Sequence, residues 1–104
     1  MQYRQKAHYP LKQVKELIRN GKWLVKGNAR TEAKRCFGWN SEEIKRALLA
    51  LRPSHFYKSE PSKCIPGVTI DYYKADHLMG ENIYTHLYID HEEVVLVINS
   101  FKRV

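Results

Sequence analysis

The spacing of apolar residues changes near residue 68, and this change limits the possible folds more than any other feature. Before it, apolar residues recur every three or four positions, as at Leu11, Val14, Leu17 and Ile18, which is typical of amphipathic helices. After it, the segments 68–74, 83–90 and 93–101 are rich in β-branched and aromatic residues. Helices followed by an antiparallel meander predict an α+β domain, in which N-terminal helices pack on one face of a C-terminal antiparallel sheet.

Turn residues predict the bounds of the first helices. Pro10 suits the first turn of a helix, and Asn20-Gly21 provides a left-handed stop. The short apolar run at 23–25 predicts a brief strand, and Gly27-Asn28 interrupts the pattern. A second short helix is then expected over about residues 30–37, because Gly38 follows as its C-terminal stop.

A capping pattern predicts the third helix. Asn40, with Glu43 three residues later, approximates a capping box, and Pro53 marks the end of this helix. The two prolines of residues 59–67 predict a polar loop there. Turns are expected at 79–82 and 91–92.

The chain is basic. Eighteen Lys and Arg against eleven Asp and Glu give a net charge of +7 on 104 residues. This charge indicates a polyanionic partner such as RNA or DNA, and a solvated basic surface without a specific ligand explains it equally well. This length predicts one domain, residues 1–104. The chain has no apolar run of about 18 residues and no apolar stretch near its start, so we expect no membrane span, no signal peptide and a cytoplasmic location.

The strand expected over 83–90 carries the most chemical information. Its odd positions are apolar or Thr, whereas its even positions are Tyr84, His86, Tyr88 and Asp90, and period two places the two sets on opposite faces. Tyrosines can stack on bases, and a histidine can transfer protons near neutral pH. Ordinary cross-strand aromatic pairing is the alternative explanation.

Other chemical signatures are weak. Lys58 and Lys102 lie at the ends of expected elements, where sites are commonly built. Cys36 and Cys64 have no metal or redox spacing, and the five histidines show no ligand pattern. We therefore expect no metal and no other cofactor.

Four short motifs, in order along the chain, resemble the motility quorum-sensing regulator (MqsR) toxins. In that family the corresponding pieces are FYKS, QDVY followed by a basic residue, VY and SFK. Here they are Phe56-Tyr57-Lys58-Ser59, Asp71-Tyr72-Tyr73-Lys74, Ile83-Tyr84 and Ser100-Phe101-Lys102. The resemblance covers nearly the whole chain. It implies a RelE-like fold and a metal-independent endoribonuclease that cuts mRNA, in many members at GCU. It also implies a cognate antitoxin, through which alone operator DNA would be contacted.

The resemblance also implies site residues. Lys58, Tyr84 and Lys102 match catalytic positions of the family, and His86, chosen from its face of the strand, is our candidate acid or base. We expect further RNA contacts from a second set: Tyr57, Tyr73, Lys74, Tyr88 and Arg103. The chain departs from the family pattern where a glutamine is usual, since Ile70 or, in a shifted alignment, Asp71 stands there. His86 also replaces a common lysine.

Two other functions fit the same residues. A non-catalytic nucleic-acid-binding module would use the basic face and the tyrosines without cutting the strand. A regulatory partner protein would instead pair an exposed sheet edge with another chain.

Overall fold

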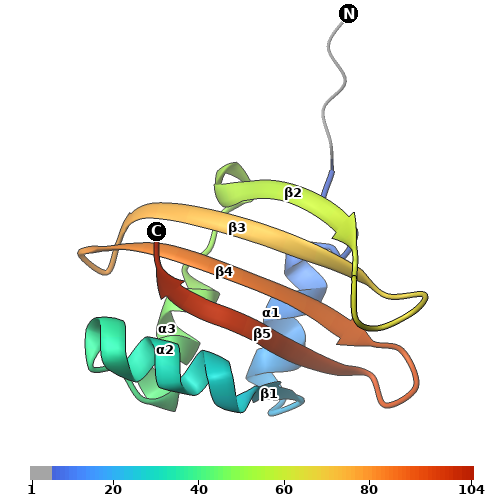
Figure 1. Ribbon diagram of the computed structural model, residues 1–104, viewed down its shortest axis with the longest axis horizontal. Helices are drawn as coiled ribbons and strands as arrows, with labels where there is room; N and C mark the ends of the chain where they lie inside the picture. The colour runs from blue at the N-terminus through green and yellow to red at the C-terminus, as the bar shows by residue number, and fades with distance from the viewer. Residues whose placement is uncertain (1–5) are drawn as a thin grey trace, which may run out of the picture.

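The computed structural model describes residues 6–104, which form helices on one side of a mixed sheet (Figure 1). The α-helices are α1 (Leu11–Arg19), α2 (Gly27–Phe37) and α3 (Ser41–Leu49), and a 3-10 turn, η1, spans Pro53–His55. The strands are β1 (Trp23–Val25), β2 (Phe56–Pro61), β3 (Thr69–Leu78), β4 (Glu81–Asp90) and β5 (Val95–Arg103). The two-layer α+β prediction is confirmed, and the architecture is consistent with a RelE-like domain.

The sheet has the strand order β1-β5-β4-β3-β2. Strands β3 to β5 form the expected antiparallel meander, β2 adds an antiparallel edge strand that was not predicted, and β1 pairs with β5 in parallel. The prediction of a wholly antiparallel sheet is therefore wrong at this edge. The reason is topological: β1 lies between α1 and α2, so no tight hairpin joins it to β5 and fixes an antiparallel direction.

The predicted helix ends are largely confirmed. Gly38 adopts a left-handed φ of 71° directly after α2, as a C-terminal stop requires. Before α3, the Asn40 side chain accepts a hydrogen bond from the Glu42 N–H (3.1 Å), and the Glu43 carboxylate accepts one from the Asn40 N–H (2.8 Å). These bonds satisfy amides that have no partner within the helix.

The start of α2 was predicted too late. Gly27 and Asn28 form its first turn instead of interrupting the chain. The Asn28 side-chain amide donates to the Asn99 carbonyl oxygen (3.0 Å), and the Thr31 hydroxyl donates to the Gly27 carbonyl oxygen (3.0 Å). Contacts with β5, which local sequence does not reveal, therefore extend the helix toward its N-terminus.

The predicted loop at 59–67 is shorter than expected. Residues 59–61 belong to β2, where Ser59 pairs with Asp71 and Pro61 with Thr69. Proline is tolerated here because β2 is an edge strand and Pro61 is its last residue. Strand β5 begins at Val95, two residues later than predicted, since Val94 takes a φ of 52° in the preceding turn.

The core lies between the helices and the sheet face that they cover. The odd residues of β4, namely Ile83, Thr85, Leu87 and Ile89, are all buried as predicted. In β5, Phe101 packs against the rings of Phe37 and Trp39, with ring centroids about 6 Å apart. Within residues 6–104, no helix is long and apolar enough to cross a membrane.

Candidate active site

Two rows of paired residues cross the sheet on the face that the helices leave uncovered. We call this face the open face. Lys58 pairs with Tyr72 and Tyr72 with His86 in one row, and Lys74 pairs with Tyr84 and Tyr84 with Lys102 in the next. Residues directly opposite one another on neighbouring strands share a face. The sheet register therefore gathers residues from all four sequence motifs into one cluster: Lys58, Tyr72, Lys74, Tyr84, His86 and Lys102.

Three aromatic rings form the centre of this cluster. The ring centroids of Tyr72 and His86 are 4.7 Å apart, those of Tyr84 and His86 are 5.7 Å apart, and those of Tyr72 and Tyr84 are 6.3 Å apart. These separations fall within the range of direct ring contact. The three rings thus form a triangle in which the imidazole contacts both phenol rings and the phenol rings contact each other.

Ammonium groups surround the rings. The Lys58 Nζ lies 4.9 Å from the centroid of the Tyr72 ring, and the Lys102 Nζ lies 5.4 Å from that of Tyr84. The Lys74 Nζ lies 4.1 Å from the centroid of the exposed Tyr57 ring. Cation–π contacts hold these ammonium groups close to the rings, and lysines are the groups that contact the phosphates of nucleic acids.

The environment of His86 favours its neutral form. Burial is the largest cause of its lowered pKa, and the ammonium groups of Lys102 and Lys26 lower the pKa further, while the Glu32 carboxylate acts in the opposite direction. The ring Nδ1 lies 3.1 Å from the side-chain Nδ2 of Asn99. A neutral imidazole at pH 7 can accept a proton, which is the first requirement of a general base.

Tyr84 and Lys58, which belong to the same cluster as His86, both have a raised pKa and stay protonated at neutral pH. Burial is the main cause of the raised pKa of Tyr84, so its phenol is a hydrogen-bond donor at neutral pH. A hydrogen bond to Glu60, at 2.9 Å, is the main cause of the raised pKa of Lys58. The site therefore combines one proton acceptor with a phenolic donor and permanent positive charge.

Two predicted RNA-contacting tyrosines are buried. Tyr73 is 1% exposed on the helix side, its ring packs against Phe56, and burial is the main cause that raises its pKa to about 12. Tyr88 is on the same side of β4 as His86 but only 8% exposed, with the Lys26 Nζ 5.6 Å from its ring centroid. Burial removes both rings from the surface that could stack on bases.

Sequence reasoning missed Tyr72, the neighbour of Tyr73. The sequence contained the information needed to choose Tyr72. Side chains alternate along a strand, so Tyr72, two positions before Lys74, lies on the same face as Lys74. The structure places Tyr72 on the open face and buries Tyr73, which the sequence analysis had chosen.

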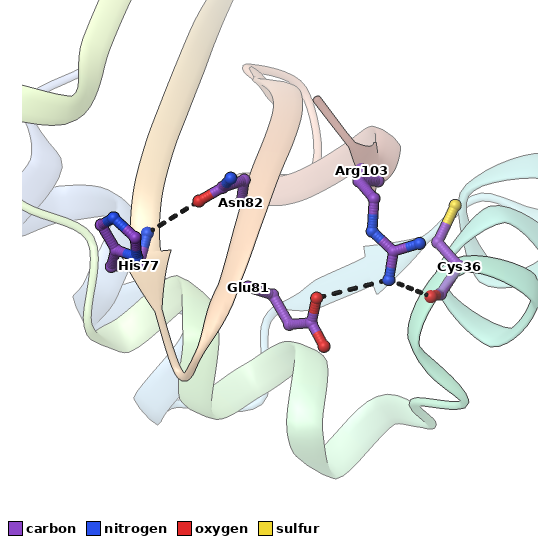
Figure 2. A network of polar contacts seen from close by, with 5 residues as sticks. All are labelled: Cys36, His77, Glu81, Asn82 and Arg103. Atoms are coloured by element: carbon purple, nitrogen blue, oxygen red, sulfur yellow. Dashed lines mark hydrogen bonds and ion pairs between the residues drawn. The ribbon is translucent and has the colours of Figure 1, made fainter.

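Arg103 also differs from its prediction. Figure 2 shows its guanidinium turned toward the end of α2, where it donates to the Cys36 carbonyl oxygen (2.7 Å) and to the Glu81 carboxylate (3.3 Å). Its partner in the register is the buried Ile83, which places Arg103 on the helix side of the sheet. The guanidinium joins β5, β4 and α2 and does not reach the open face.

The two positions that could replace the family glutamine do not present a polar group on the open face. Ile70 is apolar and only 6% exposed. Asp71 is fully buried and accepts hydrogen bonds from the backbone N–H groups of His8 (3.0 Å) and Tyr9 (2.9 Å), and from the Ser59 hydroxyl. Asp71 therefore fastens the segment before α1 to the sheet.

The described residues, 6–104, contain no group of three His, Cys, Asp or Glu side chains arranged to hold a metal ion.

A family model with the description "Motility quorum-sensing regulator, toxin of MqsA" matches residues 6–103, nearly the whole chain. No curated protein matches the chain.

Proposed function

The chain belongs to the motility quorum-sensing regulator family of toxins, and we propose that it is a metal-independent endoribonuclease that cuts mRNA, at GCU-like sites, in the cytoplasm. As a toxin of a toxin–antitoxin system it has a cognate antitoxin. Cleavage of mRNA would arrest translation and growth, and binding of the antitoxin would prevent it.

One observation carries this proposal: the His86 imidazole contacts two tyrosine rings, and the ammonium groups of Lys58 and Lys102 lie over those rings. Lysines surrounding exposed aromatic side chains are typical of surfaces that bind single-stranded RNA. A binding surface alone, however, does not need a half-buried histidine whose pKa is lowered. Perturbed titratable groups cluster at sites of catalysis, so this feature favours a nuclease over a binding module.

The cluster supports attack of an RNA 2′-hydroxyl on the adjacent phosphorus. His86 would accept the 2′-hydroxyl proton while the O2′–P bond forms. The ammonium groups of Lys58 and Lys102 would stabilise the negative charge of the phosphorane. As the P–O5′ bond breaks, the Tyr84 phenol would give its proton to the leaving oxygen. The products would be a 2′,3′-cyclic phosphate and a free 5′-hydroxyl, and a proton would then return from His86 to Tyr84.

The side chain of Asn99 contacts His86 Nδ1 and can influence which ring nitrogen carries the proton. An imidazole can act as a base at Nε2 only when the ring proton resides on Nδ1. The Nδ1 proton would then be donated to the Asn99 carbonyl oxygen, Oδ1, after a half-turn of the amide, whose two ends are nearly the same in shape. The amide can therefore hold the ring in the tautomer that catalysis needs.

The test is cleavage of a defined RNA by purified protein in excess EDTA, with the fragment ends mapped. We expect discrete cuts that leave 5′-hydroxyl ends. A matched RNA with one 2′-deoxynucleotide at the cut site should resist cleavage, because it lacks the nucleophile. Cleavage of the deoxy substrate would overturn the mechanism. RNA that is bound but left intact, both free and on translating ribosomes, would overturn the nuclease and support a binding module.

A further inference from the structure

A loop after β2 folds over the open face and encloses a hollow beside the cluster. The hollow has a volume of about 240 Å³ and lies between residues 62–65, β3 and β5. It is near the point where the pairing of β4 with β5 shifts register, between His86 and Leu87. Six of the residues that line it are used below: Lys26, Ser62, Lys63, Ile70, Tyr72 and Asn99.

The hollow is continuous with the proposed catalytic residues. Tyr72 lines it, and the ring of Tyr72 lies against that of His86, with centroids 4.7 Å apart. Asn99 also lines it, and its side-chain Nδ2 lies 3.1 Å from the His86 Nδ1. A group held in the hollow would therefore adjoin whatever His86 acts on.

The loop is internally braced. The Ser62 hydroxyl oxygen accepts hydrogen bonds from the N–H groups of Cys64 (3.2 Å) and Ile65 (3.0 Å). The Ser62 N–H donates to the Val68 carbonyl oxygen (2.7 Å), and the Val68 N–H donates to the Ile65 carbonyl oxygen (3.3 Å). The hollow is thus formed before any ligand binds, which lowers the entropy cost of binding.

Size and chemistry limit the occupant. Pockets for small molecules are usually about 300–1,000 Å³, so this hollow suits a flat group smaller than a whole nucleotide. Ile70 and Tyr72 offer apolar and aromatic surface, whereas Lys26, Lys63 and the Ser62 hydroxyl offer hydrogen-bond donors. Among the described residues that line the hollow, none carries a carboxylate. Donors of this kind match carbonyl oxygens better than amino groups.

We propose that this hollow binds one base of the RNA substrate, next to the scissile phosphate, and selects guanine or uracil, which carry a keto oxygen at C6 or C4, over adenine or cytosine, which carry an amino group there. This inference rests on the proposed ribonuclease function and adds a specificity-determining residue, Lys63, which lies outside the cluster. The ammonium of Lys63 would donate to the keto oxygen, while Tyr72 and Ile70 contact the faces of the base.

The test compares bases at each position that flanks the mapped cut. At a purine position, inosine keeps the 6-oxo group and 2-aminopurine lacks it; at a pyrimidine position, uridine keeps the 4-oxo group and cytidine has an amino group there. We expect kcat/KM to favour the keto base and Lys63→Ala to reduce that preference about tenfold, as expected for the loss of one hydrogen bond from a charged donor. Lys63→Arg should keep the preference. Lys12→Ala, which removes an equal charge from the exposed side of α1, should also keep it.

Failure of this inference can be distinguished from failure of the nuclease. Cleavage by the wild type with a preference that Lys63→Ala leaves unchanged would overturn the inference alone. If the wild type cuts no RNA, no cut position is defined, and Kd is measured instead by fluorescence anisotropy with short single-stranded RNAs that differ only in carrying the keto or the amino base. A keto preference in Kd that Lys63→Ala reduces would then support the base site without the nuclease, whereas equal Kd values would overturn it.

Discussion

The two faces of the sheet differ although the same strands build both. In β5, Phe101 is buried against Phe37 and Trp39, while its neighbour Lys102 is exposed beside Tyr84. In β3, Tyr73 is buried and Tyr72 contacts His86. Because side chains alternate along a strand, one residue supports the fold and the next is free for chemistry. Substitutions on one face should therefore change stability, and substitutions on the other should change activity.

The largest expected effect is on the open face, at His86. His86→Ala should lower the rate of RNA cleavage about 10²–10⁴-fold, the usual contribution of a general acid or base, with little change in the free energy of unfolding. His91→Ala, in the exposed turn before β5, is the matched control. The acidic limb of the wild-type kcat/KM profile should have a midpoint below 6.5, because burial lowers the pKa of His86. A loss under threefold would exclude this role.

Adjacent cations of β5 provide the next comparison. Lys102→Ala should reduce kcat about 10²–10³-fold, as expected when one group that stabilises a developing oxyanion is removed. Arg103→Ala should leave cleavage nearly unchanged and instead loosen the contact between β5 and α2. Single-turnover kinetics and thermal unfolding of both variants would measure the two effects. Equal losses of activity would show that the faces are not separate.

The two adjacent tyrosines should respond in opposite ways. Tyr73→Ala should destabilise the protein by about 3–5 kcal/mol, as for other large aromatic residues removed from a core. Tyr72→Ala should weaken RNA binding by about 1–3 kcal/mol, the usual contribution of one base-stacking ring, with a smaller effect on stability. Urea unfolding and fluorescence anisotropy with uncleavable RNA would separate the two outcomes. Weaker RNA binding by Tyr73→Ala, measured while the variant is folded, would contradict the assignment of faces.

The buried carboxylate of Asp71 should affect stability alone. Asp71→Ala leaves the N–H groups of His8 and Tyr9 without their acceptor, which should cost about 2–3 kcal/mol. The segment before α1 should then exchange its amide hydrogens faster, while the cluster keeps its activity under conditions where the protein stays folded. Unchanged exchange at His8 and Tyr9 would show that Asp71 does not fasten this segment.

The smallest expected effect is the dependence of stability on pH, in which His86, a residue of the open face, contributes to the free energy of unfolding. Burial lowers the pKa of His86 below its value in the unfolded chain, so folding opposes protonation. The free energy of unfolding should therefore fall as pH decreases through 6.5 toward the folded-state pKa, and should be insensitive to this group above 6.5. His86→Gln should reduce this slope in urea titrations between pH 7.5 and 5.5. An unchanged slope would indicate that another group dominates it.

The sequence alone determined the order of the helices and of every strand except β2, the helix stops and much of the open face. Local chemistry is enough for these features: a left-handed Gly38, an asparagine cap and period-two alternation depend on residues close in sequence. The same alternation correctly separated His86 and Tyr84 from the buried odd positions of β4. Lys58 and Lys102 were singled out by their place at the ends of expected elements and again by the family resemblance, and the register places them beside Tyr72 and Tyr84.

Only the tertiary structure decided the rest, because it depends on partners far away in the chain. The parallel direction of β1, the burial of Tyr88 and the turning of Arg103 toward α2 follow from contacts between segments that are distant in sequence. The hollow beside His86 exists because residues 62–65 fold over β3 and meet Lys26 and Asn99 from elsewhere in the chain. A sequence pattern indicates on which side of its strand a side chain lies, but packing decides whether that side is open and what it touches.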